Sequence, residues 1–124
     1  MTSFQLGSLI YTFFEDELKC QKGLRPASIR SYRDVLQLFL LFLVDDTQRK
    51  ITRLNLSDLT AERVRRFLKL LEEKRHNQIR TRNHRLAAIR TFFGYLATRD
   101  PTILVEAQKV AAIPVKRTSP PQTL

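Results

Sequence analysis

The stretch from residue 77 to 96 constrains the fold of this chain more than any other. Apolar side chains recur there at helical spacing, and no acidic residue occurs between Glu73 and Asp100. The cations of that interval are Lys74, Arg75, Arg80, Arg82, Arg85, Arg90 and Arg99. This pattern predicts an amphipathic helix that packs on a core along one side and meets an anionic partner along the other.

The two sides of this predicted helix follow from placing successive residues about 100° apart. The apolar sector holds Ile79, Leu86, Ile89, Phe93 and Leu96, and the opposite side holds Arg80, Thr81, His84, Ala88 and Thr91. Because the opposite side is small, polar and basic, it can approach a groove and bond to phosphates or base edges. Arg85 lies at the edge of the apolar sector and Arg82 inside it, so their stems can cover the core while their heads reach outward.

Four further helices are predicted from caps and apolar spacing. Ser3 and Gly23 bound the first, Pro26 starts the second, Thr60 caps the third, and Asn77 caps the basic helix. The five predicted helices cover approximately residues 4–21, 26–46, 60–75, 77–98 and 102–112, and no strand is predicted within 47–59. The fold class predicted is therefore all-α.

The second helix is predicted to be anchored at one end and exposed at the other. Its apolar stripe is Ile29, Tyr32, Leu36, Phe39 and Leu43. Leu41 and its neighbours make the C-terminal half apolar nearly all round, which places that half at the centre of the core. The side chains near its start that stay available to a ligand are Arg30, Ser31, Arg33 and Asp34. In the short last helix, the packing candidates are Leu104, Val105 and Val110.

Charge favours a nucleic-acid partner. With 124 residues, 43% of them hydrophobic, the chain has the size of one domain and can bury a core. Its 22 Lys and Arg residues exceed its 12 Asp and Glu residues, for a net charge of +10. Nucleic acid is thus the first partner to consider, and a solvated basic surface without a specific ligand is the alternative.

No membrane segment, disulfide or cofactor site is predicted. The longest apolar run, residues 38–44, is shorter than the ~20 residues that cross a bilayer, and the N-terminus lacks the features of a signal peptide. Cys20 is the single cysteine, and it is too far in sequence from His76 and His84 to suggest a metal site. We therefore expect a soluble, cytoplasmic protein without metal or cofactor.

Three blocks of sequence resemble one protein family. They cover residues 24–43, 59–68 and 81–96, and Asp100-Pro101 follows the last block. In order and spacing they are similar to the N-terminal core-binding domain of tyrosine recombinases, the phage integrase family, over about residues 4–113.

The resemblance implies a compact SAM-like orthogonal bundle of four to five helices, whose second and fourth helices face the major groove and backbone of double-stranded DNA. It also implies that residues 1–113 form this DNA-binding domain and that 114–124 are a linker toward an absent catalytic domain. Such a domain mostly touches phosphates. The DNA-facing candidates carried over by position are Ser28, Arg30, Ser31, Arg33, Lys74, Arg80, Thr81, Arg82, His84, Arg85 and Arg90.

Assembly is also implied by the resemblance. The first and last helices of the longer protein are expected to touch neighbouring protomers in a tetramer on synapsed DNA. The isolated domain is expected to be monomeric and to bind weakly, because it lacks the contacts of the other half of a clamp.

The cutting chemistry of this family is not expected in this chain. Tyrosine recombinases cleave with a Tyr nucleophile while Arg, Lys and His groups stabilise charge at the scissile phosphate. Their His-x-x-Arg block does not occur, since His76 and Arg80 are four residues apart, and Tyr11, Tyr32 and Tyr95 fall in predicted packing helices. The longer protein is expected to break and rejoin DNA in integration or recombination.

Two other functions stay open at this point. One is a helical interaction domain that docks an acidic protein partner through its basic face. The other is a freestanding nucleic-acid binder that shares the helical fold but never had a catalytic half.

Overall fold

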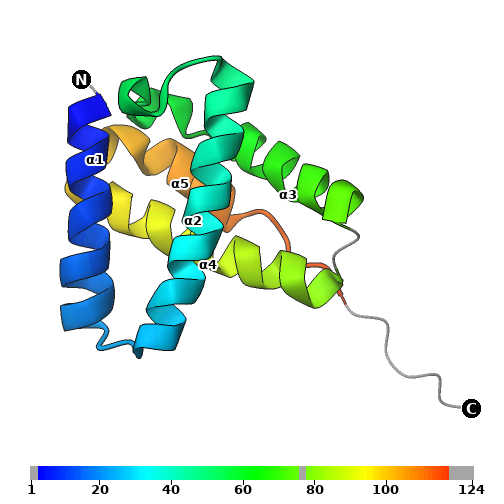
Figure 1. Cartoon of the computed structure of the whole chain (residues 1–124), viewed down its shortest axis with the longest axis horizontal. Helices are drawn as coiled ribbons and strands as arrows, with labels where there is room; N and C mark the ends of the chain where they lie inside the picture. The colour runs from blue at the N-terminus through cyan, green and yellow to red at the C-terminus, as the bar shows by residue number, and fades with distance from the viewer. Residues whose placement is uncertain (1–2, 76–77, 118–124) are drawn as a thin grey trace, which may run out of the picture.

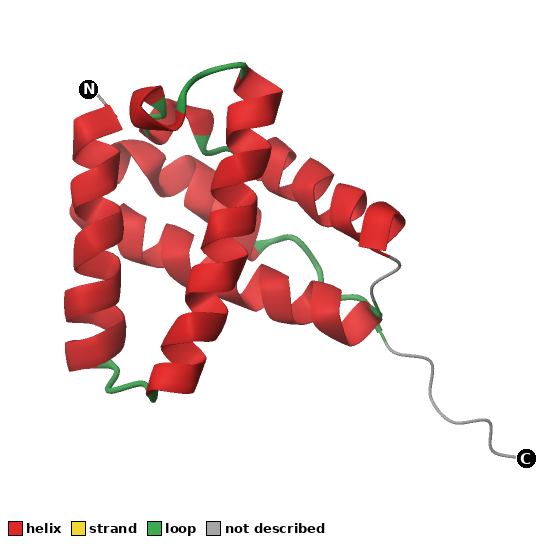
Figure 2. Cartoon of the chain, viewed as in Figure 1, coloured by secondary structure: helices red, strands yellow, loops and turns green. Residues whose placement is uncertain are grey.

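The regular elements are all helical in the residues that the computed structural model describes, 3–75 and 78–117 (Figure 2). The α-helices are α1 (Ser3–Thr12), α2 (Pro26–Thr47), α3 (Ala61–Arg75), α4 (Ile79–Arg99) and α5 (Leu104–Ala111). A π-helical segment, η1 (Phe13–Gln21), continues α1, and the short 3-10 turns are η2 (Ile51–Arg53), η3 (Leu56–Asp58) and η4 (Pro101–Ile103). Within these ranges no helix is long and apolar enough to span a membrane.

The helices form an orthogonal bundle built around α4. α1 continues into η1, which packs on α2, and α2 in turn crosses over α4 (Figure 1). α4 also packs against α3, α5 and η1. It is therefore covered on more than one side. The predicted all-α, SAM-like orthogonal bundle is confirmed.

Local sequence signals set several helix ends as predicted. Gly23 has a φ of 58°, in the left-handed region that favours glycine, just after η1. Pro26 is the first residue of α2. Thr60 Oγ1 accepts the backbone N–H of Arg63 at 3.2 Å and so caps α3. Asn77, the predicted cap of α4, lies outside the described residues.

The predicted first helix is observed, but its second half is π-helical. Lys22 donates its backbone N–H to Glu17 O at 2.8 Å, five residues back. Phe13 and Leu18 are both fully buried, and five residues of α-helix would point them about 140° apart. The wider π turn brings residues five apart to nearly the same side. The side chain of Ser3, the predicted cap, is outside the described part of the chain.

Aromatic side chains form the centre of the core. The ring centroid of Phe39 in α2 lies 5.1 Å from the ring centroid of Phe67 in α3 and 6.4 Å from that of Phe93 in α4. Phe13 of η1 packs edge-on against Phe92 of α4 at 5.1 Å. All of these rings are at most 1% exposed. Since burying one such side chain stabilises by roughly 1.5–3 kcal/mol, this cluster fixes how α2 crosses α4.

Some packing predictions are wrong. Leu41 of α2 is 61% exposed, and Leu104 and Val105 of α5 are 46% and 59% exposed. α5 has only 8 residues, and it is held instead by Val110, which is buried as predicted, and by Ile103 just before it. Within the described ranges, no helix covers α2 at Leu41 or α5 at Leu104 and Val105.

Candidate nucleic-acid interface

The second turns of α2 and α4 meet although they are far apart in sequence. Ser31 Oγ and His84 Nε2 share a hydrogen bond at 2.8 Å across the two helices, where α2 packs on α4 (Figure 1). Two residues that the sequence predicts to face a ligand are thus in contact.

Cations without an internal partner flank this contact along both helices. Arg30 and Arg33 of α2 and Arg80 of α4 are exposed, and none of them makes a hydrogen bond or ion pair with the described residues. Ser28 is exposed and Thr81 is half-buried on the first turns of these helices. Because no internal pair has to be broken, these arginines can bind an anion at little cost.

The starts of both helices also lack caps. The N-cap residues, Arg25 for α2 and Gln78 for α4, make no side-chain cap hydrogen bond, and no acidic residue lies in either first turn. The first backbone N–H groups of each helix and the positive end of its dipole therefore stay open to an anion. Together with the arginines, they make this surface suited to phosphate.

Arg85 lies on the side of α4 that faces α2. It is half-buried and lines a shallow pocket of about 650 Å³ with Asp34, Gln37 and Leu38 of α2. As its place at the edge of the apolar sector predicts, its stem covers part of the core surface.

The open side of α4 is narrower than helix geometry predicts. Ala88, predicted to face outward, is 3% exposed, because α4 is covered by α2 as well as by α3 and α5. Thr91 is half-buried, and its hydroxyl donates to Ala87 O at 3.0 Å. Of the five residues predicted to face outward, only Arg80 and His84, in the first two turns of α4, are therefore exposed.

Arg82 and Arg90 lie on another side of α4 and bind the C-terminal segment. Arg82 is 8% exposed, and its Nη1 donates to Pro114 O at 2.9 Å. Arg90 Nη2 donates to Ile113 O. The prediction that these two residues contact DNA is untested, and these bonds give each of them a role inside the protein.

Lys74 is the remaining predicted contact. It is exposed near the end of α3, and no described interaction joins it to α2 or α4. The structure therefore does not bring it together with the other candidates.

Sequence reasoning missed Glu72, Asn83 and Lys116. The side-chain amide of Asn83 donates to Lys116 O at 2.8 Å and accepts the Lys116 backbone N–H at 2.9 Å. Lys116 Nζ pairs with Glu72 Oε2 at 2.9 Å. No local pattern signals these bonds, because the partners are 33 and 44 residues apart.

Three arginines near the other end of α2 are paired with acids. Asp46 at the end of α2 accepts hydrogen bonds from Arg66, and from Arg63 Nε at 2.8 Å. These bonds, that of Arg66 first, hold the pKa of the Asp46 carboxyl below its usual range. Arg49 Nε lies 3.6 Å from Asp58 Oδ1. Arg49, Arg63 and Arg66 are thus paired with acids, whereas Arg30, Arg33 and Arg80 make no ion pair within the described residues.

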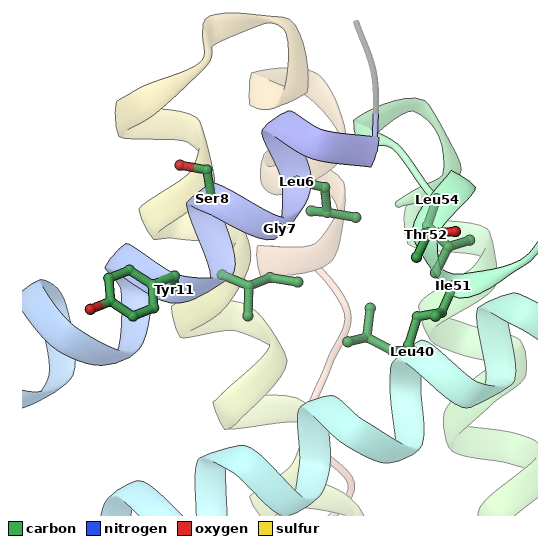
Figure 3. A pocket seen from close by; sticks show the side chains of 9 residues that line it. Leu6, Gly7, Ser8, Tyr11, Leu40, Ile51, Thr52 and Leu54 are labelled. Atoms are coloured by element: carbon green, nitrogen blue, oxygen red, sulfur yellow. The ribbon is translucent and has the colours of Figure 1, made fainter.

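An apolar pocket lies between α1 and α2, toward the other end of the bundle. Its volume is about 730 Å³, and it is lined by Leu6 and Tyr11 of α1, Leu40 of α2 and Ile51 of η2, among others (Figure 3). None of its lining side chains is charged. The pocket therefore lacks the groups that bind a phosphate.

Comparison with known proteins fits this geometry. Residues 12–100 match the family described as phage integrase, N-terminal SAM-like domain. The chain belongs to this family. The matched residues of this integrase-family domain include the starts of both α2 and α4, and the resemblance noted in the sequence is confirmed.

Two relatives from Sinorhizobium fredii (strain NBRC 101917 / NGR234) are similar to the domain. It is 43% identical over 112 residues to "Putative integrase/recombinase y4rD" and 37% identical over 112 residues to "Putative integrase/recombinase y4rC". The matches cover 90% of this chain but 40% and 34% of those proteins, so the chain spans less than half the length of either relative. No solved structure matches the chain.

Proposed function

We propose that this domain binds double-stranded DNA through the starts of α2 and α4, as the N-terminal half of a clamp formed by a longer site-specific recombinase or integrase. The observation that carries the proposal is the Ser31–His84 bond, which joins the second turns of two helices that begin without a side-chain cap. The exposed arginines near these helix starts have no partner among the described residues. The names of both relatives, integrase/recombinase, support a role in recombination.

The proposed contacts go mainly to phosphates. Arg30, Arg33 and Arg80 supply the charge, while backbone N–H groups at the two helix starts supply directed hydrogen bonds. The hydroxyls of Ser28 and Thr81 add neutral donors beside them. Because the Ser31–His84 bond fixes the crossing of the two helices at their second turns, both helix starts can engage the same stretch of duplex.

Cutting and rejoining belong, in this proposal, to the remainder of a longer protein. Tyr95 is 8% exposed; its hydroxyl donates to Thr12 Oγ1 at 2.7 Å and accepts a hydrogen bond from Arg99 Nε at 3.0 Å. A hydroxyl held in this way supports packing rather than attack on a phosphate. This domain would position the duplex for groups supplied by the rest of that protein.

Docking of an acidic protein partner is the rival function. It needs the same positive charge, but it does not need two helix starts held at a fixed angle. Binding to an acidic protein together with failure to bind any duplex would favour this rival.

Charge removal at the proposed surface tests the function. In the 124-residue chain, Arg33→Ala with Arg80→Ala should weaken binding to duplexes of any sequence and make the log–log salt slope shallower by about 2, because two phosphate contacts are lost. The matched control is Lys50→Ala with Arg53→Ala, which removes two exposed cations beyond the other end of α2. Equal losses in both double variants would show that net charge, rather than this surface, controls binding.

We also propose that the longer protein assembles on DNA through α1 and α5. The support is their exposed apolar side chains, since Tyr11 is 67% and Val105 59% exposed. The 124-residue chain by itself should sediment as a monomer, and Val105→Ser should impair assembly of the longer protein on DNA. A stable oligomer of the chain in the absence of DNA would contradict this arrangement.

A further inference from the structure

The segment that follows α5 is bound to α3 and α4 at several points. Ile113 is 1% exposed, and its carbonyl accepts a hydrogen bond from Arg90. Arg82 Nη1 donates to the next carbonyl, Pro114 O, at 2.9 Å. Two residues further, the amide of Asn83 makes paired bonds of 2.8 and 2.9 Å with the backbone of Lys116. This segment is therefore part of the folded domain up to residue 116.

The charges of the same region hold it in place. Glu72 Oε2 lies 2.9 Å from Lys116 Nζ, and Glu72 Oε1 lies 3.8 Å from Arg82 Nε. One carboxylate thus serves the segment and the arginine that binds it. We call Glu72, Arg82 and Asn83 the clasp.

The clasp brings the segment to the candidate DNA surface. Asn83 follows Arg80 by three residues on α4, and side chains three apart on a helix have their Cβ atoms about 5–6 Å apart. The backbone of Lys116, bonded to Asn83, therefore lies within a turn of Arg80. The chain leaves the bundle beside the start of α4 (Figure 1).

Arg117 differs from Lys116 in its availability. The charge of Lys116 is paired with Glu72, whereas Arg117 is exposed and makes no bond within the described part of the chain. An exposed arginine that follows the residue bonded to Asn83, and that has no partner among the described residues, meets the same requirement that marks the other candidate phosphate contacts.

We infer that the clasp positions Arg117 as a further contact to the DNA backbone, so that the segment after α5 belongs to the DNA-binding surface. This inference rests on the function proposed above. Because the segment is already held, Arg117 binds a phosphate without the entropy cost of ordering a free tail. Arg82 and Asn83 are then positioning residues, which act on DNA through the segment that they hold.

A double-mutant cycle in the 124-residue chain tests the inference. Arg117→Ala should weaken duplex binding several-fold and make the salt slope shallower by about 0.9. Asn83→Ala removes no charge but should also weaken binding, and Arg117→Ala should then cost clearly less in that background than in the parent. Lys50→Ala, which removes one exposed cation far from the clasp, is the control for charge alone.

Each outcome of the cycle has a defined meaning. If Arg33→Ala with Arg80→Ala weakens binding but Arg117→Ala does not, the inference fails while the proposed function stands. If none of these variants changes binding, the proposed function fails as well. Equal losses from Arg117→Ala in the parent and in Asn83→Ala overturn the role of the clasp.

Amide hydrogen exchange tests the clasp apart from DNA. The N–H of Lys116 should be protected in the parent and lose that protection in Asn83→Ala, while core amides such as that of Phe93 stay protected in both. A Lys116 amide that exchanges freely in the parent overturns the inference, even if Asn83→Ala proves too unstable for the binding cycle.

Discussion

Arginines on α4 lie in different surroundings, so their removal should have different effects. Arg80 is exposed and has no described partner, whereas Arg82 is 8% exposed and donates to Pro114 O. Arg82→Ala should lower the free energy of unfolding by roughly 1–3 kcal/mol, because the bond of this buried arginine to Pro114 O and its ion pair with Glu72 are lost. Arg80→Ala should leave stability within about 0.5 kcal/mol and weaken DNA binding. Urea unfolding measures the free energy of unfolding of both variants. A larger loss of stability in Arg80→Ala than in Arg82→Ala would contradict the structural role given to Arg82.

Single aromatic rings in the core carry a large share of the stability. Phe39 and Phe93 are fully buried, with ring centroids 6.4 Å apart. Phe39→Ala or Phe93→Ala should destabilise by ~3–5 kcal/mol through lost burial and the cavity left behind. Leu41→Ala is the matched control on α2, since Leu41 is 61% exposed. Melting temperatures of the Phe variants close to the parent's would contradict their place in the core.

Replacing glycine by alanine should have opposite effects at a helix end and inside a helix. Gly23 ends the first helical element at a φ of 58°, while Gly94 lies exposed inside α4, where an added Cβ would meet no atom within 4 Å. Gly94→Ala should therefore raise the free energy of unfolding by about 0.5–1 kcal/mol. Gly23→Ala should lower it by about 1 kcal/mol, because alanine is strained in the left-handed region. Thermal unfolding compares the two, and a stabilised Gly23→Ala would count against the observed turn.

The junction of α2 and α3 adds a pH-dependent contribution. Arg66 and Arg63 lower the pKa of the Asp46 carboxyl, so its stabilising effect is complete above the unfolded pKa of about 3.9 and is lost as the pH falls through the lower folded pKa. Asp46→Asn should cost roughly 1 kcal/mol at pH 7. The difference from the parent should shrink as the pH drops below about 4. Urea titrations at neutral and acidic pH measure it, and a difference that persists in acid would mean that ion pairing is not its cause.

At the scale of elements, the sequence predicts the features that depend on residues close together in the chain, such as helix ends. Pro26, Gly23 and Thr60 mark helix ends through local backbone chemistry, and the structure confirms all three. Helix periodicity cannot reveal which side of a helix a neighbouring helix covers. The predictions that Ala88 is exposed and that Val105 is buried are wrong for this reason. The same limit applies to the π-helical segment, which depends on what two buried residues pack against.

In the candidate site, too, features set by residues close in sequence could be predicted, and contacts between residues far apart in sequence could not. Its cations could be recognised in the sequence because a run without acids is a local property. The Ser31–His84 bond and the bonds of Arg82 to the C-terminal segment join residues 53 and 32 apart. Such pairs follow from the packing of whole helices. Identical residue types on one helix therefore could not be separated into binding and structural roles beforehand.

At the scale of the whole molecule, charge is distributed unevenly. Asp46 pairs with Arg63 and Arg66 where α2 ends and α3 begins, and an apolar pocket lies between α1 and α2. Arginines without a partner among the described residues lie near the starts of α2 and α4. The described part of the C-terminal segment ends beside the start of α4 (Figure 1).

The salt dependence of duplex binding by the 124-residue chain tests most directly the claim that the starts of α2 and α4 bind the DNA backbone. If about five phosphates are neutralised, a plot of the logarithm of the association constant against the logarithm of salt concentration should have a slope of roughly −4 to −5. Affinity should be similar for unrelated duplexes, since most contacts go to phosphates. A slope near zero, or no binding to any duplex at ~50 mM salt, would contradict the account.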